Sequence, residues 1–156
     1  MKDITSLVTD LHAPTIKKRQ AAAVELGKSG NLQAIGPLAA ALTDPHPDVR
    51  GAIVQALGRL GDSDAVPALI KALGDTEPNI RCAAIAALGK IKDRAAVDPL
   101  MNCVKDKDIT VRTGAAEVLG KLGDRRAVIP LTSLLEDPFE EVRNSARAAI
   151  VRLTKK

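Results

Sequence analysis

Metal binding and acid–base catalysis rely on histidine and carboxylate side chains, and this chain of 156 residues contains two histidines. The segment Asp-Pro-His-Pro-Asp at 44–48 places His46 between Asp44 and Asp48, which suggests a metal site. The three groups lack the ligand spacing of zinc or transition-metal motifs. His12 is expected to end the first helix, where an imidazole suits the helix C-terminus. The sequence therefore predicts a solvated turn at 44–48 and no metal ligand.

The two cysteines, Cys82 and Cys103, are the candidates for thiol chemistry. They form no Cys-x-x-Cys motif and cannot make a disulfide framework, so two free thiols are expected. Cys103 lies on the apolar face of a predicted helix and is expected in the core. Cys82 should face outward, but no activating base lies near it in sequence. We predict no catalytic residue and no cofactor.

Nucleotide-binding and hydrolase motifs are absent, because no Gly-x-Gly-x-x-Gly, P-loop or Gly-x-Ser-x-Gly sequence occurs. The glycines instead recur with a fixed period, directly after leucines. They form the column Gly27, Gly58, Gly89 and Gly120. These glycines are therefore interpreted as architectural.

The same period of 31 residues organises the whole chain. Arginines keep it at five positions, Arg19, Arg50, Arg81, Arg112 and Arg143. Aspartates keep it at Asp44, Asp75, Asp106 and Asp137. Self-similarity at such a period indicates a repeat array, in which each unit buries its apolar face by stacking on its neighbours. Function is therefore expected on a surface rather than in a deep pocket.

Apolar residues recur at helical spacing in two segments of each unit, so each unit is predicted to be a pair of amphipathic helices. First helices are expected at 32–42, 63–73, 94–104 and 125–135. Second helices are expected at 47–60, 78–91, 109–122 and 140–153. Residues 4–11 and 15–28 supply one more pair. Glycines at 30, 61 and 123 fit left-handed caps after second helices, whereas Lys92 breaks that column.

Composition narrows the class of protein. With one phenylalanine and no tryptophan or tyrosine, the core must be built from aliphatic and alanine side chains, which suits closely packed helices. Charged residues of both signs make up 27% of the chain, which argues against disorder. No run approaches the roughly 18 apolar residues of a membrane span. The N-terminus lacks a signal peptide's apolar run, so a cytoplasmic protein is expected.

With substitutions, the units share the pattern Asp-x-x-x-x-Val-Arg, then Ala-Ala-x-x-Leu-Gly-x-x-Gly-Asp-x-x-Ala-Val-x-Pro-Leu. This pattern resembles the HEAT-like repeats of phycobilisome lyase subunits. The resemblance implies an all-α, armadillo-like fold, a right-handed α-solenoid of five helix pairs in one domain. The repeats would span about 1–30, 31–61, 62–92, 93–123 and 124–156. The first repeat departs from the pattern with Ala13 in place of Asp, as a terminal cap can.

In HEAT repeats, an Asp and an Arg six residues apart form a ladder between adjacent turns. The resemblance implies this role for Asp44, Arg50, Asp75, Arg81, Asp106, Arg112, Asp137 and Arg143. The alternative is a phosphate-binding stripe, because regularly spaced guanidinium groups suit a polyanion. Four of the five arginines have an Asp six residues before them. This favours Asp–Arg ion pairs within the fold over phosphate binding.

A second basic column lies near the C-termini of the second helices. It consists of Lys28, Arg59, Lys90, Lys121 and Arg152. Cations at these positions stabilise the helix dipole, which accounts for them without a ligand. Stacking would also line them along one edge, where they could meet nucleic acid or an acidic partner. The net charge of +4 and the lack of Tyr and Trp argue against nucleic acid.

Second helices line the concave face in arrays of this kind, and the positions after each ladder arginine point into it. These positions include Gln20, Val24, Gly51, Ala52, Gln55, Cys82, Ala83, Ala86, Thr113, Gly114, Glu117, Asn144 and Ser145. They are small and weakly polar, whereas an idle solvent face usually carries charges. A shallow trough of this kind can receive a helix or an extended segment of another protein.

The last helix should leave one flank without a following repeat. Exposure of Val142, Ile150 or Leu153 there, with Phe139 at the start of the helix, would allow the array to stack on another copy. The polar C-terminal tail fits a monomer equally well. A monomer or a weak homodimer through the array ends is therefore expected.

The function predicted from sequence is a non-catalytic scaffold or adaptor that binds a protein on its concave face. Two alternatives stay open. The first is a subunit of a bilin lyase or a related tetrapyrrole-handling enzyme, as the resemblance suggests. The second is weak binding of nucleic acid or an acidic partner through the basic column. The deoxyhypusine hydroxylase branch of these repeats relies on His-Glu pairs for iron, and this chain contains none. That activity is therefore excluded.

Overall fold

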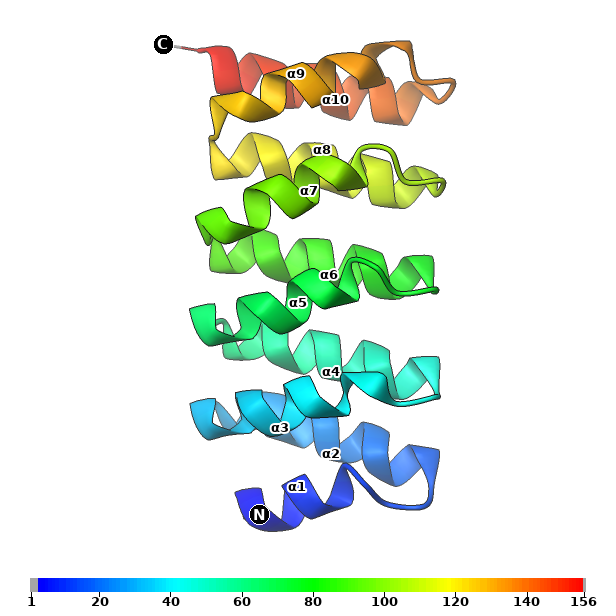
Figure 1. Cartoon of the computed structure of the whole chain (residues 1–156), viewed down its shortest axis with the longest axis vertical. Coiled ribbons are helices and arrows are strands. Elements are labelled where there is room, and N and C mark those ends of the chain that lie inside the picture. The colour runs from blue at the N-terminus through cyan, green and yellow to red at the C-terminus, as the bar shows by residue number, and fades with distance from the viewer. Residues whose placement is uncertain (1–2, 156) are drawn as a thin grey trace. The chain divides into compact units, whose positions relative to one another are not determined.

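The computed structural model describes residues 3–155 and shows an all-α repeat fold. Within that range the chain forms ten α-helices and no β-strand. Figure 1 shows the helices in chain order from the blue N-terminus to the red C-terminus. The expected α-solenoid class is therefore confirmed. No helix in the described range is both long and apolar enough to cross a membrane.

The backbone divides into two compact units, Met1–Ile91 and Lys92–Lys156, called unit 1 and unit 2 below. Unit 1 contains α1 (Ile4–Asp10), α2 (Ile16–Ser29), α3 (Ile35–Ala40), α4 (Pro47–Leu60), α5 (Val66–Ala72) and α6 (Pro78–Ile91). Unit 2 contains α7 (Val97–Cys103), α8 (Ile109–Leu122), α9 (Val128–Thr132) and α10 (Glu140–Thr154). The second helices, α2, α4, α6, α8 and α10, begin and end within about one residue of the predicted limits.

The first helices α3, α5, α7 and α9 are shorter than predicted, because α3 and α9 end in 3₁₀ helix and each of the four opens with a turn of it. Asn31 or an aspartate caps that turn, as where the Asp62 carboxylate accepts the Asp64 N–H at 2.9 Å. A proline then enters the following α-helix, and it has no N–H to donate to the carbonyl four residues earlier. For Pro67 that carbonyl belongs to Ser63, the first residue of a 3₁₀ turn. The N-cap residue and the proline therefore determine where the backbone changes from 3₁₀ to α-helical geometry.

The second helices of unit 1 and unit 2 end as the sequence indicates. Gly30, Gly61 and Gly123 have φ angles of 68°, 69° and 78°. Lys92, which breaks the glycine column, has φ of 60°, so its backbone keeps the left-handed form of the glycines. A non-glycine residue in that conformation costs on the order of 1 kcal/mol.

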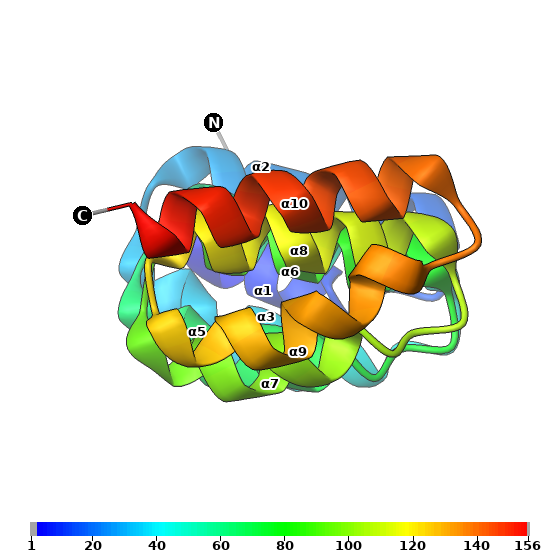
Figure 2. The same ribbon diagram turned by 90° about the horizontal axis from the view of Figure 1, so that it is seen from above.

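The core is aliphatic, as composition required. The leucine column is fully enclosed, with 0% exposure at Leu26, Leu57, Leu88 and Leu119. In unit 2, α8 and α10 form one layer and α7 and α9 the other (Figure 2), and Leu119 belongs to α8. Cys103 is buried as expected, and neither cysteine forms a disulfide.

Glycine sets the distance between successive second helices. A Cβ atom added to Gly58 would lie 2.7 Å from the Cβ of Ala87, and one added to Gly120 would lie 2.9 Å from the Cα of Ala149. These distances are too short for any side chain. The Leu-Gly pair of the repeat therefore buries a leucine on one side and admits a neighbouring helix on the other.

The flank of α10 differs from the sequence expectation. Val142 and Leu153 are buried, at 0% and 4% exposure, because both face the core of unit 2 rather than its flank. The large exposed apolar residues of α10 and its N-cap are Val151 and Phe139, and Ile150 is half-buried. Val151 occupies the column that glycine holds in the other repeats, so its side chain blocks the close approach that Gly58 and Gly120 allow.

Candidate functional site: a trough along the second helices

Ion pairs between repeats hold the second helices of unit 1. The Nε and Nη2 atoms of Arg50 donate to the two carboxylate oxygens of Asp75 at 2.8 and 3.0 Å. Its Nη1 atom donates to the backbone carbonyl of Asp44 at 3.0 Å. Arg19 makes the same two-point contact with Asp44, at 2.6 and 3.1 Å. Each guanidinium therefore links its own turn to the turn of the following repeat.

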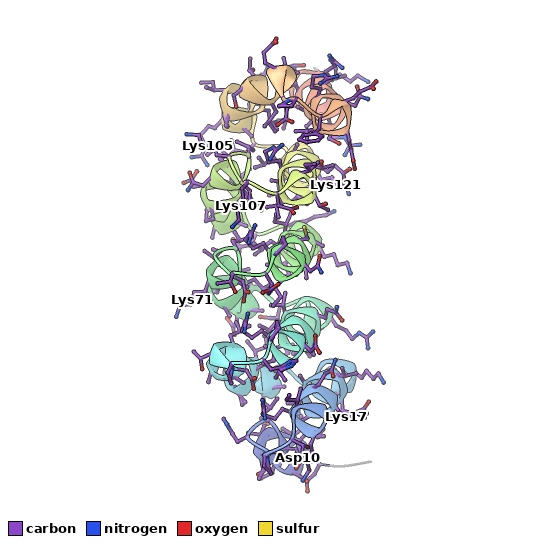
Figure 3. The ribbon with its side chains drawn as sticks, turned by 90° about the vertical axis from the view of Figure 1, so that its right-hand side faces the viewer. Asp10, Lys17, Lys71, Lys105, Lys107 and Lys121 are labelled. Carbon is purple, nitrogen blue, oxygen red and sulfur yellow. The ribbon has the colours of Figure 1, made fainter. Side chains whose placement is uncertain are left out.

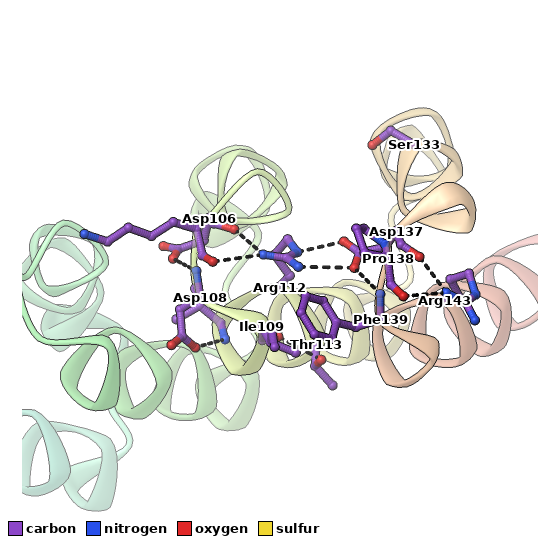
Figure 4. A network of polar contacts seen from close by, with 12 residues as sticks. Asp106, Asp108, Ile109, Arg112, Thr113, Ser133, Asp137, Pro138, Phe139 and Arg143 are labelled. Atoms are coloured by element: carbon purple, nitrogen blue, oxygen red, sulfur yellow. Dashed lines mark hydrogen bonds and ion pairs between the residues drawn. The ribbon is translucent and has the colours of Figure 1, made fainter.

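Unit 2 repeats the arrangement, as Figure 4 shows. Arg112 donates to Asp137 at 2.8 and 3.1 Å and to the carbonyl of Asp106 at 2.8 Å. The ring of Phe139 lies 6.0 Å from the guanidinium carbon of Arg112. Arg143 donates to the backbone carbonyl of Asp137 at 2.7 Å. Phe139, which sequence analysis placed at an exposed end, thus has one face against the ladder.

The predicted Asp–Arg ladder forms within each unit, but its ion pairs join residues 25 apart instead of six apart. The aspartate six residues before Arg50 or Arg112 offers its backbone carbonyl, whereas the paired carboxylate lies 25 residues later. Hydrogen bonds from Arg50 hold the pKa of Asp75 below its ordinary value, and Arg112 does the same for Asp137. Because their donors are occupied, Arg19, Arg50 and Arg112 are not available as a phosphate-binding stripe.

A shallow hollow of about 670 Å³ lies along α2, α4 and α6 of unit 1. Its floor includes Val24, Ala52, Gln55, Ala83 and Ala86, all predicted from sequence for the concave face. Its wall contains Lys28, Arg59 and Lys90, which sequence analysis assigned to a separate basic edge. The predicted concave face and the predicted basic edge therefore line the same hollow in unit 1.

A second hollow, of about 350 Å³, adjoins the first and shares Val24, Ala52, Gln55 and Ala83 with it. Gln20 and Gly51 also line it, together with Asp48 and Glu77 at the N-terminal ends of α4 and α6. We call the two hollows together the unit 1 trough. It has an uncharged floor, a basic edge of Lys28, Arg59 and Lys90, and an acidic edge of Asp48 and Glu77.

The hollow in unit 2 is smaller, at about 440 Å³, and lies along α8 and α10. Its lining includes Lys121 and Arg152 from the basic column and Asn144 and Ser145 from the predicted concave face. Glu117 also lines it, so this floor carries a negative charge.

Three residues predicted for the concave face line none of these hollows: Cys82, Thr113 and Gly114. Thr113 is 7% exposed, and its hydroxyl donates to the carbonyl of Ile109 at 2.9 Å, so it serves the helix instead of a partner. Cys82 is half-buried. Asp48 and Glu77 were not predicted to line this surface, although their positions in and just before the first turn of a second helix indicate where their side chains would lie.

The histidine turn is structural. The Nδ1 atom of His46 accepts the backbone N–H of Asp48 at 3.2 Å and caps α4. His12 lies two residues beyond the end of α1 and is exposed. Over residues 3–155, no group of three or more His, Cys, Asp or Glu side chains could hold a metal ion.

Comparison with known families assigns the fold. The family model for HEAT repeats matches residues 4–79 and 66–151, which together cover most of the chain. The chain belongs to the HEAT repeat family. This HEAT repeat chain has no match among curated protein sequences.

Solved structures give the same assignment. A chain of the complex of CpcE and CpcF of phycocyanin lyase from Nostoc sp. PCC7120 is similar, with a TM-score of 0.82 and 26% identity. The match covers 100% of this chain but 66% of that one, so this chain spans just under two thirds of the lyase chain's length. A designed armadillo repeat protein in complex with the peptide (KR)4 matches with a TM-score of 0.74 and 19% identity, over 96% of this chain and 81% of that one.

Human deoxyhypusine hydroxylase is more distant, with a TM-score of 0.54 and 17% identity over 96% of this chain and 84% of that one. At this identity the likeness concerns the fold alone. This chain contains no His-Glu pair.

Proposed function

We propose that this HEAT repeat protein is a non-catalytic interaction module that binds a segment of another protein in the unit 1 trough. One observation carries the proposal. The floor residues Val24, Gln55 and Ala83 are uncharged, although they are exposed or half-buried and lie between two charged edges, whereas Ala52 beside them is buried at 7% exposure. A surface without such a role usually carries charges, because they favour solubility.

The mechanism is rigid display. The contact between Gly58 and Ala87 and the pair between Arg50 and Asp75 fix α4 and α6 against each other. A partner that binds this surface therefore loses little free energy to ordering of the module. Small side chains on the floor also let the partner's backbone approach closely.

The comparison with the designed armadillo repeat protein supports this mode of action, because its structure contains a bound peptide. That protein shares the fold at 19% identity. The chemistry of any partner of the present chain must therefore be argued from the trough itself.

The test fills the trough without changing its charge. Gln55→Trp and Ala86→Trp place bulky rings on two exposed floor positions. Gln33→Trp and Asn102→Trp are the matched control, because both are exposed and neither lines a trough. Affinity capture from a lysate of the source organism should retain a partner on the wild type and the control and lose it on the filled variant. Equal capture by all three proteins would contradict the proposal.

A second candidate is a component of a bilin lyase or a related tetrapyrrole-handling enzyme. The structural match to the complex of CpcE and CpcF over the full chain favours it. The single aromatic residue, Phe139, offers little surface for stacking on a tetrapyrrole. Titration with phycocyanobilin separates the two candidates, since a shift of the bilin absorption band on addition of the protein would support the lyase role. An unchanged spectrum would exclude direct chromophore binding by this chain.

A further inference from the structure

The two edges of the unit 1 trough carry opposite charge, which restricts what can lie in it. Lys28, Arg59 and Lys90 stand in the last turns of α2, α4 and α6. Asp48 stands in the first turn of α4, and Glu77 directly precedes α6. A segment that crosses all three helices therefore meets cations along one side and anions along the other.

The basic edge has unused capacity for an acidic ligand. Arg59 and Lys90 are exposed and form no ion pair with any residue in the described range. Lys28 contacts Glu25 at 3.0 Å, but both side chains are more than half exposed, and such an exposed pair contributes little to stability. All three cations can therefore contact a partner without the loss of a strong ion pair.

The helix dipole explains the sign of each edge but not the floor between them. The dipole of an α-helix favours cations at its C-terminus and anions at its N-terminus. Gln55, which is exposed, and Ala83, which is half-buried, lie in the middle of α4 and α6, where the dipole has no preference. An uncharged strip between the two edges points to a ligand that contacts both edges and the floor.

Spacing selects the conformation of that ligand. Packed helices lie about 8 to 10 Å apart, so the three cations of the edge repeat at that interval. An α-helix rises 1.5 Å per residue and completes about two turns in seven residues, which brings side chains about 10.5 Å apart back to one face. In an extended strand, three residues span about 10 Å but place their side chains on opposite faces.

From these observations we infer that the unit 1 trough binds an α-helix that lies across α2, α4 and α6. The helix carries acidic residues at seven-residue intervals on the side facing Lys28, Arg59 and Lys90. Small side chains face Ala52 and Ala83, and a basic residue faces Asp48 and Glu77. This inference rests on the proposed function, because it names the chemistry of the partner that the trough receives.

The probe is a synthetic 21-residue helix rich in alanine, with Glu at every seventh position, Lys along the opposite flank and one Trp. Because the protein contains no tryptophan or tyrosine, the peptide's Trp reports binding through fluorescence anisotropy without interference. A reordered peptide of the same composition, in which the Glu residues share no face, is the peptide control. The wild type should bind the patterned helix at least tenfold more tightly than the reordered one.

The variant Lys28→Glu, Arg59→Glu, Lys90→Glu should weaken binding of the patterned helix at least tenfold. The control variant Lys71→Glu, Lys105→Glu, Lys107→Glu changes the net charge equally and should retain affinity within about twofold. In Figure 3, Lys71 projects from the side of α5, on the opposite side of unit 1 from α2, and in unit 2 Lys105 and Lys121 lie on opposite sides. Circular dichroism should show both variants folded.

Three outcomes would overturn the inference: equal binding of both peptides, equal loss in both variants, or no binding by the wild type. Tighter binding of a polyproline segment with Glu at every third residue would overturn the helical conformation, since its repeat of about 9 Å also fits the edge. The proposed function is tested separately. A partner lost on Gln55→Trp, Ala86→Trp but retained after reversal of the basic edge would leave the proposed function intact and remove the charge-matched helix.

Discussion

The troughs of the two units share a framework and differ in their floors. In both, a glycine lies against an alanine of the next second helix, as Gly58 does against Ala87 and Gly120 against Ala149. Glu117 lines the trough of unit 2, at the repeat position that Gln55 holds in unit 1. The comparison shows that the repeat conserves the geometry of the surface, whereas its chemistry is set independently at each repeat.

The framework should fail in the same way in either unit. Gly58→Val and Gly120→Val place a branched side chain where even a Cβ lies within 2.9 Å of the next helix. Each should lower the free energy of unfolding by about 3 kcal/mol through overpacking. Gly36→Ala is the control, because nothing lies within 4 Å of a Cβ at that position. Urea unfolding measures all three, and tolerance of either valine would show that the close approach does not hold the helices.

The ladder should also contribute equally to both units. Arg50→Ala and Arg112→Ala each remove a two-point ion pair and leave a poorly exposed carboxylate, with a loss of about 2 to 3 kcal/mol. Arg125→Ala removes an exposed arginine that forms no ion pair with a described residue, and should change stability by less than about 0.5 kcal/mol. A similar small loss for all three in urea unfolding would mean that the ladder does not stabilise the array.

Acid should weaken both units through the same carboxylates. The pKa values of Asp75 and Asp137 are lower in the folded state, so the unfolded chain takes up protons first as the pH falls. The stabilisation is complete above the ordinary aspartate value of about 3.9 and is lost as the pH falls through the folded-state values. Asp75→Asn should therefore reduce the slope of unfolding free energy against pH below about 4. An unchanged slope would mean that these carboxylates do not contribute to acid unfolding.

The smallest expected effect tests the difference between the floors. Gln55→Glu gives unit 1 the acidic floor of unit 2 and should weaken binding of the acidic helix about five- to tenfold, with little change in stability. Glu117→Gln makes the reverse change and should leave binding in unit 1 unaffected. Anisotropy titration at low and physiological salt would measure both. Equal effects of the two changes would mean that the peptide does not distinguish the units.

The second helices could be predicted from the sequence almost to the residue, because their apolar period, prolines and capping glycines agree. The 3₁₀ turns were missed, since they depend on how a capped turn and a proline such as Pro67 share the backbone hydrogen bonds. The pairing of Arg50 with Asp75 was missed because both aspartates lie in the same column, and the choice between them requires the stacking of repeats.

The candidate site was predicted in part. The floor residues Ala52 and Gln55 and the basic residue Arg59 were all singled out, but their union in one trough depends on the direction in which the helices stack. The burial of Thr113 could not be predicted from its repeat position, because it depends on the neighbouring side chains and not on the polarity of Thr113 itself. Asp48 was considered only as a metal ligand beside His46, which hid its place on the acidic edge.

Alanine methyl groups allow the most direct test, because they line both troughs. In a spectrum of protein labelled at alanine methyls, titration with the patterned acidic helix should shift Ala52, Ala83 and Ala86, which line the unit 1 trough, and leave Ala148 of the unit 2 trough unchanged. Such a pattern would place the bound helix on α4 and α6. Shifts at Ala148 without shifts at Ala83 and Ala86, or no shifts at all at a saturating peptide concentration, would contradict the assignment of binding to the unit 1 trough.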